Sequence, residues 1–547
     1  MTEPVPRLIH TGHGNTVSYK GKYLYSQRDP KKNPQKVAAA VQVYPKTLII
    51  VPSPLLFYGI RTLLERLPHD CHILCIETDQ RLMAFTLEHA PDDLLHNETI
   101  SIVRTDDPAA LTAYIDTLDT GRFRRASLLA LSGGYRLAQS VYESFAAAAE
   151  RHIQRYWQNR ITLVHMSRLW TKNIIQNLAR FYRWFGPFPV MSHKPIVVAG
   201  AGESLEKNLD LLRKLRERFF LVAVDTALPV LTLSGIYPDL VVVLEGQLIN
   251  SGDFIGHGNR RLSIISDLSA HPSTLGSIKG EKHFVLSLFA QSAFLKRLES
   301  CGLHIPSLRP MGSVGIAAVQ LARRLSNAPL FLTGLDFCYV PGKPHSRGAL
   351  SHILSLTVSR RDRPVGWYGT SLQHPPIPAP GVSGENVTTN LVLYSYGLDL
   401  DELIKSETDI YDLRREGIKL QAVPLLDESD FLQVLKGWEE TGAGASADRF
   451  SAQTGNAENS KLLVSNFLQK ELGLLNEFID QYRRRDSATA SADRTRLIKT
   501  LNTVDYIYLD FPDAREITDP AEGFLIRAAA SAADYRFYIQ KALKVLA

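Results

Sequence analysis

The segment 194–248 constrains the fold of this chain more than any other stretch. It opens with a short apolar run, 196–199, which predicts a buried parallel strand. A glycine turn and a stretch with leucines at helical spacing follow, and further apolar runs at 220–224 and 240–244 predict the next strands. Strand, glycine turn and helix in this order indicate a Rossmann-like α/β domain with a parallel sheet.

Polar residues follow each of these predicted strands and form a candidate nucleotide site. A glycine turn before a helix lets the backbone approach a phosphate, which the free N–H groups of the helix start can bind. A carboxylate at the end of the second strand commonly binds a ribose hydroxyl. We therefore assign phosphate binding to the turn, and ribose or sugar contacts to the next two strand ends, namely Gly200, Gly202 and Ser204, then Asp225 and Thr226, then Glu245 and Gln247. The turn lacks the third glycine of the dinucleotide fingerprint, so an ordinary βα turn remains the alternative.

A second block, 310–348, repeats this arrangement. Gly312 and Ser313 precede a helix with apolar residues on one face, and we expect them to reach the nucleotide from a second helix N-terminus. An apolar run at 330–333 predicts a further strand, which is followed by Asp336 and, nine residues later, by His345. Imidazole titrates near neutral pH, which suits His345 for accepting a proton.

In their order and spacing, these segments resemble the motility-associated factor (Maf) proteins, whose central domain is similar to bacterial sialyltransferases and to MptE-like proteins. The matching segments are 198–205, 224–227, 312–314, 333–337 and 342–345. The resemblance covers most of the chain. It implies a glycosyltransferase that moves a nonulosonic acid, such as pseudaminic or legionaminic acid, from a CMP donor to Ser or Thr of flagellin, in support of flagellar assembly and motility.

The resemblance also implies roles for individual residues. His345 is expected to be the catalytic base, as a histidine in a comparable place is in the sialyltransferases, and Asp336 is expected to orient it or to bind a metal. Because a lone Asp at a strand end is not a metal site, no metal is expected to be essential, and assistance by Mg²⁺ is left open. CMP-nonulosonic acid is the expected donor substrate, and flagellin is the expected acceptor.

Two other functions remain open. A distant archaeal branch of the resembled family is a 6-hydroxymethylpterin pyrophosphokinase, which uses ATP and would need paired carboxylates for magnesium. Asp225, Glu245 and Asp336 could supply them, although the flanking domains of this chain count against that enzyme. A non-catalytic flagellar assembly scaffold is the other alternative, and the presence of the His345 segment counts against it.

The whole chain is expected to be a multidomain α/β protein with six parts. They are an N-terminal hairpin and lead-in at 1–45, a Rossmann-like α/β domain at 46–160, a helical connector at 161–193, the central nucleotide-sugar-binding domain (GT-A-like or sialyltransferase-like) at 194–435, a Gly/Ala/Ser-rich linker at 436–461 and a C-terminal helical domain at 462–547.

Two details of these parts bear on function. In the domain at 46–160, the turn Pro52-Ser53-Pro54 offers few N–H groups to a phosphate, which favours a structural or acceptor-docking role over a second cofactor site. Pro, Gly and Ser between 352 and 385 predict a long loop, in which Trp367 and Tyr368 either stack on a sugar or pin the loop.

Composition narrows the class of protein. A net charge of +6 over 547 residues is mild. The sequence contains no dense Lys/Arg tract of the kind that indicates nucleic-acid binding. The four cysteines contain no CxxC pair, which favours a reduced, cytoplasmic protein. The N-terminus lacks the apolar core of a signal peptide, and no run reaches the roughly 18 apolar residues that a membrane span needs.

Overall fold

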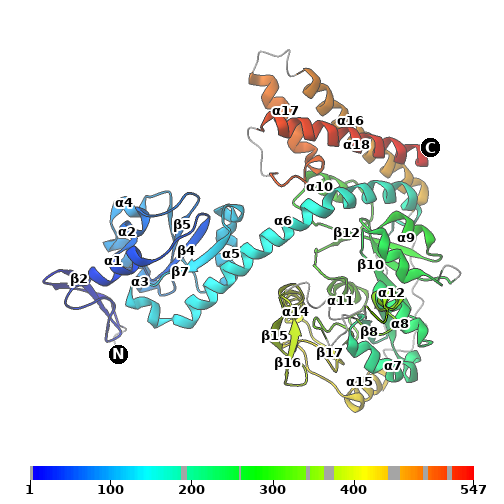
Figure 1. The fold of residues 1–547 in the computed structure, drawn as a ribbon, viewed down its shortest axis with the longest axis horizontal. Coiled ribbons are helices and arrows are strands. Elements are labelled where there is room, and N and C mark those ends of the chain that lie inside the picture. Colours follow the sequence, from blue (N-terminus) through cyan, green and yellow to red (C-terminus); the bar gives the residue numbers. More distant parts are fainter. Residues whose placement is uncertain are drawn as a thin grey trace. The chain divides into compact units, whose positions relative to one another are not determined.

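The computed structural model describes residues 4–186, 194–257, 260–339, 345–362, 375–440, 456–484, 491–513 and 520–547. The chain divides into two compact units, Met1–Leu163 and Val164–Ala547. Helix α6 (Gln139–Phe181) contributes residues to both of them, as Figure 1 shows. Each unit is built around a parallel sheet of its own.

In its described part, the first unit has a three-stranded antiparallel sheet and a four-stranded parallel sheet, the latter in the order β6-β5-β4-β7. The antiparallel sheet pairs β1 with β2 and β2 with β3, which confirms the predicted N-terminal hairpin. The strands are β1 (Arg7–Thr11), β2 (Gly14–Tyr19), β3 (Lys22–Tyr23), β4 (Thr47–Pro52), β5 (His72–Glu77), β6 (Ile100–Arg104) and β7 (Arg125–Leu128). The helices of this unit, besides the start of α6, are α1 (Lys32–Ala40), α2 (Ile60–Leu64), α3 (Gln80–His89), α4 (Asp92–Leu95) and α5 (Pro108–Thr117).

Both faces of this parallel sheet are covered. Ile49 and Val51 belong to one core, whereas Leu48 and Ile50 belong to another, because successive side chains of a strand point to opposite faces. The entire strand β4 is buried, as expected for a parallel strand between two layers of helices.

The second unit contains, within the described residues, an eight-stranded sheet in the order β13-β12-β11-β10-β9-β8-β14-β17, with all neighbours parallel. Its strands are β8 (Ile196–Ala199), β9 (Phe220–Val224), β10 (Leu240–Val243), β11 (Ile264–Asp267), β12 (Lys282–Ser287), β13 (Ser307–Leu308), β14 (Leu330–Thr333) and β17 (Ile410–Asp412). This sheet confirms the Rossmann-like class predicted for the central segment.

Helices cover both faces of the large sheet. They are α7 (Glu203–Lys214), α8 (Leu228–Leu233), α9 (Pro272–Ser277), α10 (Ala293–Glu299), α11 (Val314–Leu325), α14 (Leu391–Ile404) and α15 (Glu428–Glu440). A further helix, α12 (Leu350–Val358), buries none of its residues. Val242 of β10 packs in the core that contains α7 and α11, whereas Val241 and Val243 pack in a second core with the end of α6. The alternation again places the two cores on opposite faces of the sheet.

The C-terminal helices α16 (Ala457–Arg484), α17 (Ser491–Thr503) and α18 (Glu522–Leu546) lie side by side as a bundle in Figure 1. The bundle shares the second core with β10, β11, β12 and α6. Asp505 accepts hydrogen bonds from the Ser292 hydroxyl and the Ala293 N–H, so it caps helix α10. Arg297 of α10 also forms an ion pair with the fully buried Glu471 of α16. The bundle is therefore fastened to the sheet by apolar packing, a helix cap and an ion pair.

Two loop predictions need correction. Residues 350–358 form helix α12, although the sequence predicts a loop from 352 onward. Residues 377–380 form strand β15 (Ile377–Pro380), which pairs with β16 (Asn386–Thr389). Trp367 and Tyr368 lie outside the described residues. The predicted linker at 436–461 is helical at both ends, in α15 and α16, and its middle lies outside the described residues as well. The six domain boundaries stay a prediction.

Among the residues that the structure describes, none of the helices combines the length and the apolar character that a bilayer span needs.

Candidate functional site

The order of the large sheet reverses between β8 and β14. From β8 the chain runs through β9 to β13 on one side, and then crosses to β14 on the other side. In open parallel sheets, ligands bind outside the carboxyl ends of the strands at such a switch point. Here the strands end in two glycine turns, 200–202 after β8 and 334–336 after β14. We call these the first and the second glycine turn.

The two glycine turns interlock. The Gly200 N–H donates to the Thr333 carbonyl oxygen at 2.8 Å, and the Gly202 N–H donates to the Gly334 carbonyl oxygen at 2.8 Å. A Cβ atom on Gly200 would lie 2.3 Å from the Gly334 oxygen, and one on Gly334 would lie 2.1 Å from the Gly200 oxygen. Contact between the turns therefore requires glycine at positions 200 and 334. The predicted contacts of Gly200 and Gly202 with the sugar-nucleotide substrate stay predictions.

Asp336 and Ser204 join the second turn to the start of α7. The Asp336 carboxylate accepts hydrogen bonds from the Ser204 N–H at 2.8 Å and from the Ser204 hydroxyl. The Ser204 hydroxyl oxygen also accepts the Gly334 N–H at 2.8 Å. Burial raises the pKa of Asp336 to about 6, although the bonds from Ser204 and the charge of Arg414 act in the opposite direction.

These contacts bear on two predicted roles. Ser204 is fully buried, and its N–H and hydroxyl both donate to Asp336, so it holds the turn together. The Asp336 carboxylate thereby caps α7. The contact of Ser204 with the donor phosphate and the role of Asp336 in orienting His345 stay predictions. Buried carboxylates need such donors, because an unpaired buried charge is costly.

The His345 segment lies on the first glycine turn. Next to His345, the Ser346 N–H donates to the Ala201 carbonyl oxygen at 2.8 Å, and the Ser346 hydroxyl donates to the Gly202 carbonyl oxygen. The Arg347 N–H donates to the Glu206 carboxylate on α7 at 3.0 Å. The structure thus brings the candidate base to the turn that the sequence assigns to phosphate binding. Residues 342–344 of the matching motif lie outside the described residues.

His345 itself is partly exposed. Its Nδ1 lies 3.1 Å from the Ser351 hydroxyl of α12. Surrounding protein atoms desolvate the imidazole and lower its pKa below the ordinary value. A lowered pKa keeps the ring neutral at physiological pH, which is the state that a general base requires.

Asp225 lies at the end of β9, at the same edge of the sheet. Its Oδ1 accepts hydrogen bonds from the Thr226 N–H at 2.8 Å and from the Thr226 hydroxyl at 3.2 Å. Burial, and then the charge of Asp253, raise the pKa of Asp225 to about 7. Asp253, which the sequence analysis missed, has a buried Oδ1 that finds no hydrogen-bond partner among the described residues, and burial raises its pKa to about 6. The predicted ribose contacts of Asp225 and Thr226 stay predictions.

Glu245 and Gln247 follow β10 and are the more accessible part of this edge. The Glu245 carboxylate accepts the Gln247 N–H at 3.0 Å, and the Gln247 side chain is exposed. Between them, Gly246 is buried against Trp170 of α6, whose ring atom would lie 2.8 Å from an added Cβ. Glu245 and Gln247 are thus free of the tight packing that encloses Ser204.

Gly312 and Ser313 precede α11. Ser313 caps the helix, since its hydroxyl oxygen accepts the Gly315 N–H at 3.2 Å. An added Cβ on Gly312 would lie 2.2 Å from the ring of Tyr396 on α14. The predicted helix N-terminus is therefore present, with an aromatic ring beside it. Its contact with a nucleotide stays a prediction.

Arg414 is a further residue that the sequence analysis missed. It is fully buried, forms two hydrogen bonds with the Asp412 carboxylate, and donates to the Leu335 carbonyl oxygen in the second glycine turn at 2.8 Å. Arg414 therefore links the Asp412 carboxylate of β17 to the second glycine turn. In the described part of the chain, no group of three or more His, Cys, Asp or Glu side chains is arranged to hold a metal ion.

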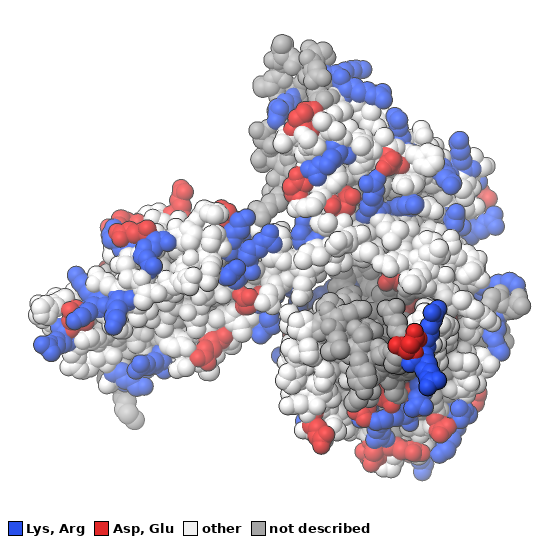
Figure 2. All heavy atoms as spheres, in the orientation of Figure 1, with Lys and Arg blue, Asp and Glu red and all other residues white. Residues whose placement is uncertain are grey.

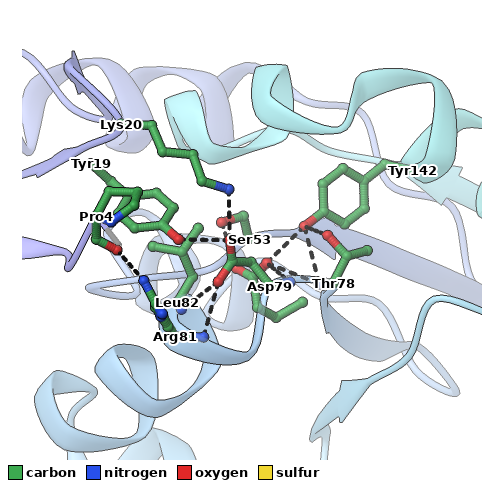
Figure 3. Close-up of polar contacts among 10 residues, drawn as sticks. Pro4, Tyr19, Lys20, Ser53, Thr78, Asp79, Arg81, Leu82 and Tyr142 are labelled. Carbon is green, nitrogen blue, oxygen red and sulfur yellow. Dashed lines mark hydrogen bonds and ion pairs between the residues drawn. The ribbon is translucent and has the colours of Figure 1, made fainter. Parts of the chain in front are cut away.

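The first unit has its own strand-end carboxylate, Glu77 of β5. It accepts hydrogen bonds from the Ser53 hydroxyl at 2.7 Å, the Tyr142 hydroxyl at 3.0 Å and the Thr78 N–H at 2.9 Å. Tyr142 points from α6 toward Thr78 (Figure 3). Because protein groups already bind both oxygens of Glu77, its arrangement favours the structural alternative over a second cofactor site.

A neighbouring carboxylate, Asp79, ties the antiparallel sheet to this edge. It accepts hydrogen bonds from Tyr19 at 2.8 Å and Lys20 at 3.0 Å, and both side chains point toward it in Figure 3. It also caps α3 through the Arg81 and Leu82 N–H groups.

Known proteins resemble this chain in sequence and in fold. Residues 170–342 match the family described as 6-hydroxymethylpterin diphosphokinase MptE-like. An uncharacterized protein of Treponema pallidum (strain Nichols) is 29% identical over 558 residues, covering 96% of this chain and 93% of the relative. A second uncharacterized protein of that organism is 35% identical over 89 residues, covering 16% of this chain and 42% of the relative.

The solved structure of a MAf glycosyltransferase from Magnetospirillum magneticum AMB-1 is similar in fold. The TM-score is 0.56 at 14% identity, covering 100% of this chain and 90% of the other. The predicted resemblance is thus confirmed: this is a multidomain α/β chain with the fold of a MAf glycosyltransferase structure and an MptE-like segment in its second unit.

Proposed function

We propose that this protein is a glycosyltransferase that moves a nonulosonic acid, such as pseudaminic or legionaminic acid, from its CMP conjugate to Ser or Thr of flagellin. The observation that carries the proposal is the position of the His345 segment on the first glycine turn, where Ser346 binds the Ala201 and Gly202 carbonyl oxygens. A candidate base is thereby held beside a candidate phosphate site. The similarity in fold to a MAf glycosyltransferase supports the same class of reaction.

In the proposed reaction, the bond between the anomeric carbon of the donor sugar and the phosphate oxygen breaks, and CMP leaves with the bonding electrons. The acceptor hydroxyl oxygen attacks that carbon from the opposite face, and its proton passes to His345.

Ser351 is proposed to set the tautomer of the base. If the Nδ1–H of His345 donates to the Ser351 hydroxyl oxygen, 3.1 Å away, Nε2 keeps the lone pair that accepts the proton. Ser351 would then act as a positioning residue on α12.

An ATP-dependent pterin pyrophosphokinase is the second candidate, although the MptE-like match over residues 170–342 is not in itself evidence of kinase activity. That enzyme needs carboxylates that are free to bind magnesium beside the phosphates. Asp336, one of the carboxylates that could bind magnesium, is instead bonded to Ser204. We therefore prefer the glycosyltransferase.

Calorimetric titration of the full chain with CMP, ATP and GTP, each with and without Mg²⁺, separates the candidates. The glycosyltransferase predicts that CMP binds without metal. Binding of ATP alone, and only with Mg²⁺, would replace it with the kinase. If no nucleotide binds, the flagellar scaffold becomes the better account.

A transfer assay tests the base directly. His345→Ala should abolish the mass increase of flagellin incubated with CMP-pseudaminic acid, while calorimetry still detects CMP binding. His304→Ala, which removes an exposed histidine elsewhere in the same unit, is the matched control and should glycosylate normally. Normal glycosylation by His345→Ala would remove His345 from the catalytic role.

A further inference from the structure

A pocket of about 270 Å³ lies between α6, the start of α9 and α18. Three of its lining residues, Lys172, Arg180 and Lys541, carry positive charge, and none of its lining residues is an Asp or Glu. Of the described residues, none forms an ion pair with any of these three cations. The pocket lining therefore brings together three cationic side chains and no acidic one.

The surrounding surface agrees with this. Figure 2 shows Lys and Arg side chains near the C-terminal end of α18, and Lys541 and Val545 of this end line the pocket. Within the pocket, burial and then the charges of Lys172 and Arg180 lower the pKa of His271. A field that opposes protonation of a histidine favours the binding of an anion.

The pocket is larger than a simple anion needs, and it has an aromatic wall. Phe537 is 60% exposed, and its ring centroid lies 5.9 Å from that of Tyr538. Tyr538 in turn has the Lys172 ammonium 5.0 Å from its ring centroid. Gln176 and Ser273 add amide and hydroxyl groups to the lining. Cations, an aromatic face and hydrogen-bonding groups together suit a ring with hydroxyls and one acidic group.

The pocket adjoins the sheet edge but lies apart from the switch point. Its lining residue Asn173 donates to the Gly246 carbonyl oxygen at 3.0 Å, and the His271 N–H donates to the Glu245 carbonyl oxygen at 3.1 Å. Both contacts are at the end of β10, which is two strands from β8, or about 10 Å at ordinary strand spacing. A ligand here would leave the glycine turns free.

We propose that the pocket between α6, α9 and α18 binds a monosaccharide bearing a phosphate or carboxylate group, at a site separate from that of the CMP donor. Lys172, Arg180 and Lys541 bind the acidic group, and Phe537 packs against the sugar ring. The sugar anion belongs to a free metabolite or to a glycan, and both present the same chemistry to the pocket.

Calorimetry on the full chain tests the assignment with glucose 1-phosphate and glucuronate as probes and with glucose and inorganic phosphate as references. Lys541→Glu should weaken binding of the two acidic sugars on the order of tenfold, because a charge-assisted hydrogen bond is lost. Lys470→Glu, an exposed change on α16 outside the pocket, should leave it unchanged. Phe537→Ala should weaken glucose 1-phosphate and leave inorganic phosphate unaffected.

Three outcomes would overturn the proposal. The first is that the wild type and the Lys541→Glu variant bind both acidic sugars with equal affinity, or that the wild type binds neither sugar. Another is equal affinity for glucose 1-phosphate and inorganic phosphate, which would remove the sugar from the assignment. The third is loss of probe binding when CMP is saturating, which would place the probes in the donor site. If the chain binds the acidic sugars but not CMP, the pocket proposal is supported, and only the proposed CMP donor is contradicted.

Discussion

The Asp336 carboxylate accepts two hydrogen bonds from Ser204, one from the backbone N–H and one from the hydroxyl, and so links the end of β14 to the first turn of α7. Both residues are buried, at 3% and 0% exposure. We expect Ser204→Ala to lower the free energy of unfolding by roughly 2 to 4 kcal/mol, because it leaves Asp336 and the Gly334 N–H each short of a partner. Urea denaturation followed by circular dichroism measures the change.

The matched control for this substitution is Ser395→Ala on α14. The Ser395 hydroxyl is exposed and donates to the Val392 carbonyl oxygen of its own helix, so its loss should change stability by less than about 0.5 kcal/mol. Equal effects of the two variants would show that the Ser204–Asp336 link contributes little.

The interlocked glycine turns give a second prediction. Gly334 has φ of 68°, and an added Cβ would lie 2.1 Å from the Gly200 carbonyl oxygen. Gly334→Ala should therefore destabilise the chain by roughly 3 kcal/mol or more, from backbone strain and overlap combined. A thermal melt with a Tm close to that of the wild type would contradict the interlock.

Gly473→Ala on α16 is the corresponding control. An added Cβ there meets no atom within 4 Å, and the residue lies inside a helix. Alanine should raise the free energy of unfolding by about 0.5 to 1 kcal/mol, because it reduces the freedom of the unfolded chain and favours the helix.

The sequence predicts the central sheet well because its signal is local. Apolar runs such as 196–199 and 220–224 form buried strands, and in a parallel sheet all their carboxyl ends meet at one edge. Helix α12 was missed for an equally local reason. Its N-cap is Ala349, which makes no side-chain cap, so no capping residue marks where the helix begins. Leu350, Ile353 and Leu354 do stand at helical spacing, but the helix buries none of its residues.

The site is harder to predict because its contacts join distant segments. Alternation and spacing place Asp336 at a strand end, but they do not say that Ser204, far earlier in the chain, will occupy its carboxylate. Arg414 and Asp253 carry no motif at all, and their importance follows from burial in the folded chain. The position of Ser346 on the first glycine turn likewise depends on a crossing of the chain that sequence patterns do not record.

The raised pKa of Asp225 leads to a prediction on stability. Its folded pKa of about 7 exceeds the ordinary value of 3.8, so between these values the folded state binds more protons than the unfolded state. Wild-type stability therefore falls as pH rises from 4 to 8, by about 1.4 kcal/mol per unit of pKa difference. The Asp225→Asn variant does not lose stability in this way. Its free energy of unfolding, relative to that of the wild type, should therefore increase by roughly 4 kcal/mol between pH 4 and pH 8.

Urea denaturation of both proteins at pH 4 and pH 8 checks this. The variant keeps the relevant hydrogen bonds, because both donors of Thr226 bind one oxygen of Asp225, which the asparagine carbonyl can replace. Asp239→Asn, on a more exposed carboxylate of the same unit, is a control for general charge effects. If the difference in free energy of unfolding between the variant and the wild type is equal at both pH values, Asp225 is not held neutral by burial.

The lowered pKa of His345 fixes the pH dependence of the proposed transfer. Because the base acts in its neutral form, the rate should rise with pH through a pKa below 6.5 and be constant from pH 7 to pH 8. Ser351→Ala removes the partner of Nδ1 and should lower kcat several-fold while leaving the KM for CMP-pseudaminic acid unchanged. Ser355→Ala, whose hydroxyl donates to the His352 carbonyl oxygen on the same helix, should leave kcat unchanged. An acidic limb centred well above pH 6.5, or one that survives in His345→Gln with measurable residual activity, would assign the titration to another group.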